Sequence, residues 1–309
     1  MDNTIKDKED YGIKVAMFIE EPKYMGEITE EEAKELNATV YSYTYGDDAI
    51  GYKLTLHWAV NTHEDTIVLA KYTYEGAVLS GVAVNHMLSL ISTNKTMPDI
   101  NAITYQGLER FLRDNPNVEA LPLDESYAIT FALDAAKLAV KQYINASLDH
   151  NEKTLLSTDS PMSIASIQET ISTHNIETLE TLANYTKAGL TDSSSHEKLL
   201  ELIEENKQLV TAKQEADDAL TEVPFKDLSP EHRVIAVDMA IDNTVREFLV
   251  MDGGDIDILS VKENGEMYEV YISYLGACSS CSSSGTGTLY AIENALKDKL
   301  DPHIRVIPI

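Results

Sequence analysis

The sequence predicts a multidomain α+β protein. Its 309 residues are enough for two or three domains of roughly 100–150 residues each. Strand-forming segments are followed by helical ones in the first part of the chain, and a second group of strands and helices lies near its end. Hydrophobic residues make up 43% of the chain, which is ordinary for a folded protein and argues against wholesale disorder.

The chain is strongly acidic. Its 24 Lys and Arg residues against 52 Asp and Glu residues give a net charge of −28. This charge argues against nucleic-acid binding and against docking on anionic membranes, because both need clustered Lys and Arg. No signal peptide is recognisable, and no stretch approaches the ~18 apolar residues of a membrane span. We therefore expect a cytoplasmic protein.

Residues 1–149 form the first predicted domain, in which strand and helix signals are mixed. Residues 38–60 are rich in Thr, Tyr, Val and Leu and break at Gly46-Asp47-Asp48, which predicts a β-hairpin. Another strand is expected at Thr66–Tyr74. The spacing of apolar residues then predicts helices over 79–92, 105–113 and 126–145.

Residues 150–212 form a second predicted segment, which is small and helical. Apolar side chains fall at helical spacing between Ile164 and Leu182. Another helix is expected from Glu197 to Ala212, with Ser193–Ser195 as its polar start. Residues 213–229 are acidic and contain proline, which predicts a linker.

Residues 230–309 predict a domain with the order α-β-β-α-β. A helix is expected from Pro230 to about Met251, with Val237, Ile241, Val245 and Phe248 on its apolar side and Gly253-Gly254 at its end. The remaining predicted elements are strands at 255–262 and 267–274 around the turn Glu263-Asn264-Gly265, a helix over 285–300 and a strand at 304–307.

The two cysteines of the chain, Cys278 and Cys281, lie three positions apart in the small-residue loop Gly276–Ser284. So few cysteines rule out a disulfide scaffold and indicate a reducing compartment. A predicted helix begins just after the loop, and its positive N-terminal end favours thiolates. Thiolates are the form that ligates metals and attacks disulfides.

Three chemistries fit this pair. A [4Fe–4S] cluster takes four thiolates, so two chains related by a two-fold axis complete its ligand set. A thiol–disulfide redox pair uses the same spacing. A zinc ion needs four ligands, hence a dimer or nearby histidines, and His303 is the histidine close by downstream. The alternative without chemistry is a pair of small residues in a loop.

Two segments closely resemble the C-terminal domain of NifU, the Nfu domain: VREFLVMDGGDIDILSV (245–261) and YLGACSSCSSSGTGTLYAIENALKD (274–298). The acidic double glycine, the G-A-C-x-x-C and the I-E-x-x-L-K helix occur in the family's order and spacing. The resemblance implies that Cys278 and Cys281 bind a [4Fe–4S] cluster shared between two protomers. Ser282 stands where the family usually has proline, which loosens the loop and costs no ligand.

The resemblance continues upstream. NYTKAG (184–189) is similar to the central [2Fe–2S] ferredoxin-like segment of NifU, and EPKYMGEI (21–28) is similar to an element of the NifU scaffold domain and its relative IscU. The family's cluster ligands would fall at or near these positions: Ser157, Asp159, Asp192 and Ser195 in the middle segment, and Asp48, Gly76 and Ala128 in the first domain. None is a cysteine, so we expect solvated polar substitutes rather than oxygen ligands of iron.

The resemblance implies a non-enzymatic iron–sulfur cluster carrier. It is expected to be a homodimer that holds a [4Fe–4S] cluster on Cys278 and Cys281 and transfers it to apo iron–sulfur proteins. The cysteine-less domains are expected to recruit a cysteine desulfurase, a scaffold protein or a chaperone, or to drive dimerisation. The alternatives are a CxxC thiol–disulfide oxidoreductase and an adaptor with little cluster role.

Overall fold

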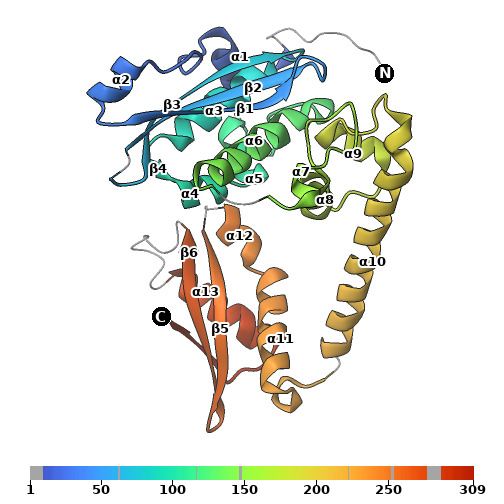
Figure 1. Cartoon of the computed structure of the whole chain (residues 1–309). Coiled ribbons are helices and arrows are strands. Elements are labelled where there is room, and N and C mark those ends of the chain that lie inside the picture. Colours follow the sequence, from blue (N-terminus) through green and yellow to red (C-terminus); the bar gives the residue numbers. More distant parts are fainter. Residues whose placement is uncertain are drawn as a thin grey trace. The chain divides into compact units, whose positions relative to one another are not determined.

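The computed structural model describes residues 10–61, 63–115, 117–145, 148–221, 223–251, 254–276 and 287–309. The chain divides into two compact units, Met1–Lys207 and Gln208–Ile309, and each is described by itself (Figure 1). Both units contain helices and sheet, which confirms the α+β class. Among the helices of these residues, none is long and apolar enough to cross a membrane.

The first unit is built on an antiparallel sheet with the strand order β1-β2-β3-β4. Its strands are β1 (Thr39–Asp47), β2 (Tyr52–Asn61), β3 (Thr66–Gly76) and the short β4 (Lys95–Thr96). The predicted hairpin is therefore confirmed. The Asp47 carboxylate accepts hydrogen bonds from the backbone of Ala49 and Ile50, and Gly51 takes the positive φ of 72° that closes the turn.

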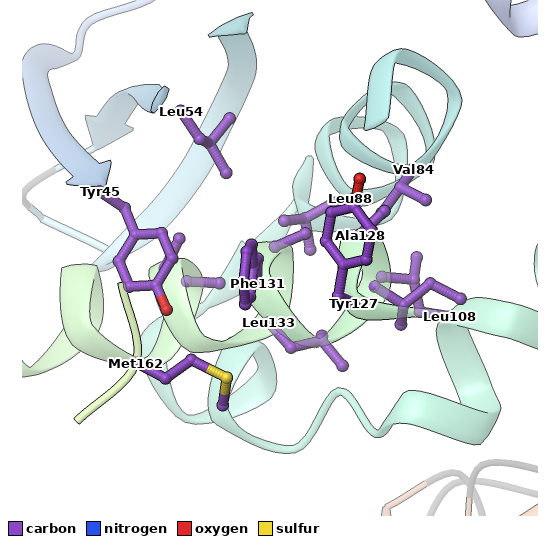
Figure 2. Packing of buried hydrophobic residues seen from close by; sticks show 14 of the residues in the cluster. Tyr45, Leu54, Val84, Leu88, Leu108, Tyr127, Ala128, Phe131, Leu133 and Met162 are labelled. Atoms are coloured by element: carbon purple, nitrogen blue, oxygen red, sulfur yellow. The ribbon is translucent and has the colours of Figure 1, made fainter. Parts of the chain in front are cut away.

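Helices pack on this sheet because its strands bury side chains on both faces. On one face lie α3 (Ser80–Ser92) and α6 (Tyr127–Tyr143), whose core residues include Phe131, Val84 and Leu88 (Figure 2). On the other face, Ala33 of α2 (Glu30–Glu35) packs with Ala59 in a smaller cluster. The remaining helices of this part are α1 (Ile13–Glu20), α4 (Met97–Asn101) and α5 (Tyr105–Leu112). The helices expected over 79–92, 105–113 and 126–145 are thus confirmed.

The middle segment shares its core with the sheet and helices before it. Its elements are α7 (His150–Lys153), α8 (Ile164–Thr173), α9 (Leu179–Thr186), the 3₁₀ turn η3 (Ser193–Ser195) and α10 (His196–Thr221). Ile167, Leu182 and Leu199 are fully buried in the same hydrophobic cluster as Phe131. The boundaries predicted at residues 149, 212 and 229 stay predictions, with a single core on both sides of residue 149.

Helix α10 is longer than expected. It was predicted to end at Ala212, and it continues to Thr221. The added residues include Lys213, Gln214 and Glu215, which are good helix formers, and no glycine or proline occurs before Pro224. The first nine residues of the expected linker, 213–221, are therefore helical.

The second unit has the order α-β-β-α-β, with a three-stranded sheet in the order β5-β6-β7. Its elements are α11 (Pro230–Asp242), α12 (Arg246–Met251), β5 (Gly254–Asn264), β6 (Met267–Gly276), α13 (Leu289–Lys299) and β7 (Ile304–Pro308), preceded by the 3₁₀ turn η4 (Phe225–Asp227). Strand β7 pairs parallel to β6, and the β5–β6 hairpin turns at Gly265, as predicted.

The helix expected over 230–251 is two helices, which corrects the prediction. The chain leaves helical geometry after Asp242, and the Thr244 hydroxyl donates a hydrogen bond to the carbonyl of Ala240. Asn and Thr favour such local bonds over a continuous helix. The interruption changes the phase of the apolar face: Val237 and Ile241 are fully buried, whereas Phe248 is 64% exposed. Gly253 and the expected helix start at Gly285 lie outside the described residues.

Candidate functional site

The two cysteines fall in the sequence between two elements, β6 and α13, that belong to the core of the second unit. Cys278 and Cys281 themselves fall outside the described residues. Strand β6 leads into the loop at Gly276 and α13 leaves it at Leu289. Ile272 on the strand and Ile292 on the helix are both fully buried in one hydrophobic cluster. The cysteine ligands and their cluster therefore stay predictions, on a loop with two well-anchored ends.

The sheet of the second unit argues against His303 as a zinc ligand beside these cysteines. The carbonyl of His303 accepts a hydrogen bond from the backbone of Tyr268, at the beginning of β6. The cysteine loop follows Gly276 at the other end of this strand, roughly 25 Å away at ~3.3 Å per residue. The His303 ring instead contacts the Asp301 carboxylate at 3.0 Å. Within one chain, His303 therefore lies at the opposite end of β6 from Gly276, the last described residue before the cysteines.

The four ligand positions of the middle segment do come together. The Asp159 carboxylate accepts hydrogen bonds from the backbone of Thr191 at 2.6 Å and Asp192 at 2.7 Å, and from the Thr191 hydroxyl at 2.6 Å. In the opposite direction, the Asp192 carboxylate accepts from the backbone of Thr158 at 3.0 Å. The loops around residues 158 and 192 are thus tied to each other by two reciprocal carboxylates.

Two serines complete this arrangement, which we call the oxygen clasp (Ser157, Asp159, Asp192 and Ser195). The Ser157 hydroxyl accepts a hydrogen bond from the backbone of Gly189 at 3.1 Å. The Ser195 hydroxyl donates to the carbonyl of Asp192 at 2.8 Å. Both serines are only 4% exposed, so the expectation of solvated substitutes is wrong for them: these hydroxyls hold the loops together from inside.

The electrostatics of the oxygen clasp follow from its donors. The Ser194 hydroxyl and the Thr158 backbone lower the pKa of Asp192 to about 2. Burial raises the pKa of Asp159, but the hydrogen bonds from Thr191 and Asp192 outweigh it, so that the pKa is lowered. Across the described residues, no group of three or more His, Cys, Asp or Glu side chains is placed to hold a metal ion. The clasp is a hydrogen-bonded structure.

The ligand positions of the first domain have diverged in another way. Asp48 lies in the exposed β1–β2 turn, 3.5 Å from the Lys53 ammonium. Gly76 is the last residue of β3, and Ala128 is fully buried in the first turn of α6. Gly76 and Ala128 have no side chain that could bind iron, and the carboxylate of Asp48 lies beside the Lys53 ammonium.

Aromatic rings fill the space between Gly76 and Ala128. Tyr52 contacts Phe131 with ring centroids 4.9 Å apart and Tyr74 at 5.3 Å, and Phe131 contacts Tyr127 at 5.3 Å. Figure 2 shows Tyr127 and Phe131 on α6 beside Ala128. The Tyr74 ring lies so close to Gly76 that a Cβ atom on this glycine would collide with it. The sequence placed Tyr52 and Tyr74 in predicted strands and Tyr127 in a predicted helix, and it did not predict that their rings pack in one cluster.

The middle segment covers this aromatic cluster. Lys187, within the NYTKAG segment, places its ammonium 4.2 Å from the centroid of the Tyr127 ring. Burial lowers the pKa of Lys187. Next to it, Glu125 is only 4% exposed and accepts a hydrogen bond from the Tyr11 hydroxyl at 2.8 Å. The region of the first unit where the resemblance places a cluster is therefore closed by aromatic, cationic and acidic side chains.

Comparison with known proteins agrees with the architecture. Residues 10–149 match the NifU-like N-terminal domain, and residues 237–307 match the NifU-like domain. The nitrogen fixation protein NifU of Trichormus azollae is 26% identical over 308 residues, covering 96% of this chain and 98% of the relative. The NifU of Azospirillum brasilense is 24% identical over 319 residues, covering 96% of each. The NifU of Anabaena sp. (strain L31) is 33% identical over 79 residues, which cover 26% of this chain and 67% of the relative. The chain belongs to the NifU family, and this membership implies a role in iron–sulfur cluster assembly.

Proposed function

We propose that the protein is a non-enzymatic carrier of a [4Fe–4S] cluster, held by Cys278 and Cys281 of two protomers and passed to apo iron–sulfur proteins. One observation carries the proposal: the chain has two cysteines, and in the sequence both fall between β6 and α13, within the residues that match the NifU-like domain. The cluster takes four thiolates, and one chain offers two. A two-fold homodimer supplies the complete set with the same loop from each copy.

The first unit supports the assignment of the cluster to the second unit. It contains no cysteine, and the two regions where the resemblance places ligands hold an oxygen clasp and an aromatic cluster. Thiolate ligation by this unit is therefore impossible. We assign to it the recruitment of a partner, a cysteine desulfurase, a scaffold protein or a chaperone, which delivers the cluster to the second unit.

The charge of the chain constrains how the cluster is held. The protein carries a net charge of −28, and a [4Fe–4S] cluster with four thiolate ligands is itself anionic. Attraction between opposite charges therefore does not retain the cluster, and the four iron–sulfur bonds must. Transfer then proceeds by ligand exchange, in which cysteines of the acceptor replace Cys278 and Cys281. Free thiols of this kind persist in the reducing cytoplasm, where we place the protein.

Anaerobic reconstitution with iron and sulfide tests the proposal. We expect about four irons per dimer, a Mössbauer spectrum of a [4Fe–4S] centre, and loss of the cluster in Cys281→Ser. Ser280→Ala, a change in the same loop that removes no thiolate, is the matched control and should keep the iron. A monomer that binds no iron but reduces insulin disulfides would overturn the carrier in favour of the thiol oxidoreductase.

The recruiting role has a separate test. The rate at which a loaded donor delivers its cluster is measured for two acceptors: the full chain, and residues 208–309, the compact second unit. We expect faster loading of the full chain when the donor complex is present, because the first unit brings the donor close. Equal loading rates for the two proteins would remove the recruiting role and leave the carrier role intact.

A further inference from the structure

A pocket of about 170 Å³ lies in the first unit, at the junction of the sheet domain with the middle segment. Its lining residues come from the end of α4, the beginning of α5, α6 and α8. Its lining includes Tyr105, Thr130, Asp134, Lys137, Glu169 and His174. None of these residues belongs to the oxygen clasp or to the cysteine loop, and the pocket has no part in cluster chemistry.

Asp134 is the most unusual residue of the pocket. It lies in the buried helix α6, and only 8% of it is exposed. One carboxylate oxygen accepts a hydrogen bond from the Tyr45 hydroxyl at 2.5 Å, and the other from the Ser166 hydroxyl at 2.7 Å. Both donors are neutral, and each oxygen keeps a further lone pair. A buried carboxylate without a cation is costly, and burial raises the pKa of Asp134.

The lysine nearest in sequence forms its ion pair with another carboxylate than Asp134. The Lys137 ammonium, three positions further along α6, pairs instead with the Glu169 carboxylate of α8 at 2.5 Å. Burial lowers the pKa of His174, whose ring stacks on Tyr185 with centroids 4.2 Å apart, so this histidine stays neutral at pH 7. The charged groups of the lining are therefore two carboxylates and one ammonium, which favours a cation over an anion.

Another polar group of the pocket has no hydrogen-bond partner among the described residues. The hydroxyl oxygen of Thr130 is buried and, as far as the structure describes the chain, forms no hydrogen bond. Thr130 precedes Asp134 by four residues on α6, which places both side chains on one face of the helix. The Tyr105 ring also lines the pocket and offers a face of the kind to which cations bind. A hydroxyl oxygen and a carboxylate on one helix face suit the N–H groups of an ammonium.

We propose that this pocket binds the protonated amino group of a small organic molecule, with Asp134 and Thr130 as its acceptors. A metal ion is the poorer match, because the described residues hold no cluster of three ligating side chains. Two classes of small molecule carry such an ammonium group, diamines and amino acids. A diamine places its second ammonium near Glu169, whereas an amino acid places its carboxylate near Lys137.

Calorimetric titration of the full-length protein with matched probes tests this proposal. The probes are 1,4-diaminobutane, L-norvaline and the neutral 1,4-butanediol. We expect at least one amine to bind and butanediol not to bind, since it has the same carbon skeleton as the diamine without its charge. Lys137→Met distinguishes the sources: it strengthens the binding of the diamine by removing a like charge, and weakens that of norvaline.

Two variants and a control locate the binding. Asp134→Asn keeps the shape of the side chain and should weaken the bound amine about tenfold or more, as expected for one charge-assisted hydrogen bond. Thr130→Val, which removes only the unpartnered hydroxyl, should also weaken it and serves if Asp134→Asn fails to fold. Glu177→Gln removes an exposed carboxylate outside the pocket and should bind as the wild type. The proposal is overturned if neither amine binds, or if Glu177→Gln loses as much affinity as the pocket variants.

Discussion

At the scale of single residues, the first unit shows what stands at the positions where the resemblance places cluster ligands. At residues 159 and 192 these are carboxylates, which accept backbone N–H groups from the facing loop. In the oxygen clasp, the Asp159 carboxylate accepts two hydrogen bonds from backbone N–H groups and a third from the Thr191 hydroxyl, and the Asp192 carboxylate accepts one from the backbone of Thr158. Hydrogen bonds between side chains and backbone thus hold the two loops together.

Removing one carboxylate of the clasp should destabilise the first unit. Asp159→Ala leaves the backbone N–H groups of Thr191 and Asp192 without an acceptor, and we expect a loss of about 1–3 kcal/mol in the free energy of unfolding. Urea unfolding at pH 7 measures this loss. Glu177→Ala, a change of an exposed carboxylate nearby in the same unit, should leave the unfolding midpoint unchanged.

The clasp also predicts how stability depends on pH. The folded pKa of Asp192 is about 2, below the ordinary value of 3.8, so the unfolded chain takes up protons first as the pH falls. The contribution of the ionised Asp192 carboxylate to the free energy of unfolding is fully present above pH 4 and disappears as the pH falls towards 2. Asp192→Asn should therefore be less stable than the wild type at pH 7, with a smaller difference at pH 2. A constant difference over this range would contradict the assignment.

The sequence predicts the candidate site only where the residue type by itself indicates the chemistry. Cys278 and Cys281 are found at once because sulfur in a CxxC has few other uses in so cysteine-poor a chain. The four residues of the clasp were named from the resemblance, but their hydrogen bonds were not predicted, because Asp159 and Asp192 are 33 residues apart and were expected to be solvated. The filling of the first domain was missed as well, since Tyr52 and Tyr74 satisfy a strand pattern regardless of what their rings contact.

At the scale of elements, the errors fall where two local preferences compete. Strands β1 to β3 were predicted well. Gly46 and Gly51, both with positive φ, lie at the two sides of the turn that connects β1 to β2. The prediction of one helix over 230–251 was wrong at Asn243 and Thr244. The helical spacing of apolar residues continues past these two positions in the sequence, but the Thr244 hydroxyl forms a local hydrogen bond there and the helix ends. Helix α10 was predicted too short because its charged continuation after Ala212 has no apolar face to mark it.

The β5–β6 turn allows a test of one glycine without side-chain interference. Gly265 has a φ of +66°, and a Cβ atom placed on it would have no neighbour within 4 Å. Gly265→Ala should therefore destabilise the second unit through the backbone alone, by about 1–2 kcal/mol. Gly287→Ala is the matched control, because that position is equally open but has no positive φ; it should be neutral or slightly stabilising. Equal effects of the two changes in thermal unfolding would contradict this account of the turn.

At the scale of the whole molecule, the two units have separate hydrophobic cores. One core contains Phe131 and Trp58 of the first unit, and the other contains Val270 and Leu296 of the second. In our proposal the two units also have separate tasks, since only the second one carries thiolates. A carrier built in this way gains from units that fold by themselves, because changes that adapt the partner surface then leave the cluster site unaffected.

This independence predicts how the molecule unfolds. Trp58 is the single tryptophan of the chain and is 2% exposed in the first core, so its fluorescence reports on the first unit alone. Leu296→Ala opens a cavity in the second core and should cost about 2–5 kcal/mol there. We expect the unfolding transition of the second unit, followed by circular dichroism, to shift to lower urea concentration in this variant. The transition followed by Trp58 fluorescence should stay in place. Phe131→Ala should do the opposite and move the Trp58 transition, by about 3–5 kcal/mol. If Leu296→Ala shifted the Trp58 transition equally, the two units would unfold as one, and the separation of tasks would have no basis in stability.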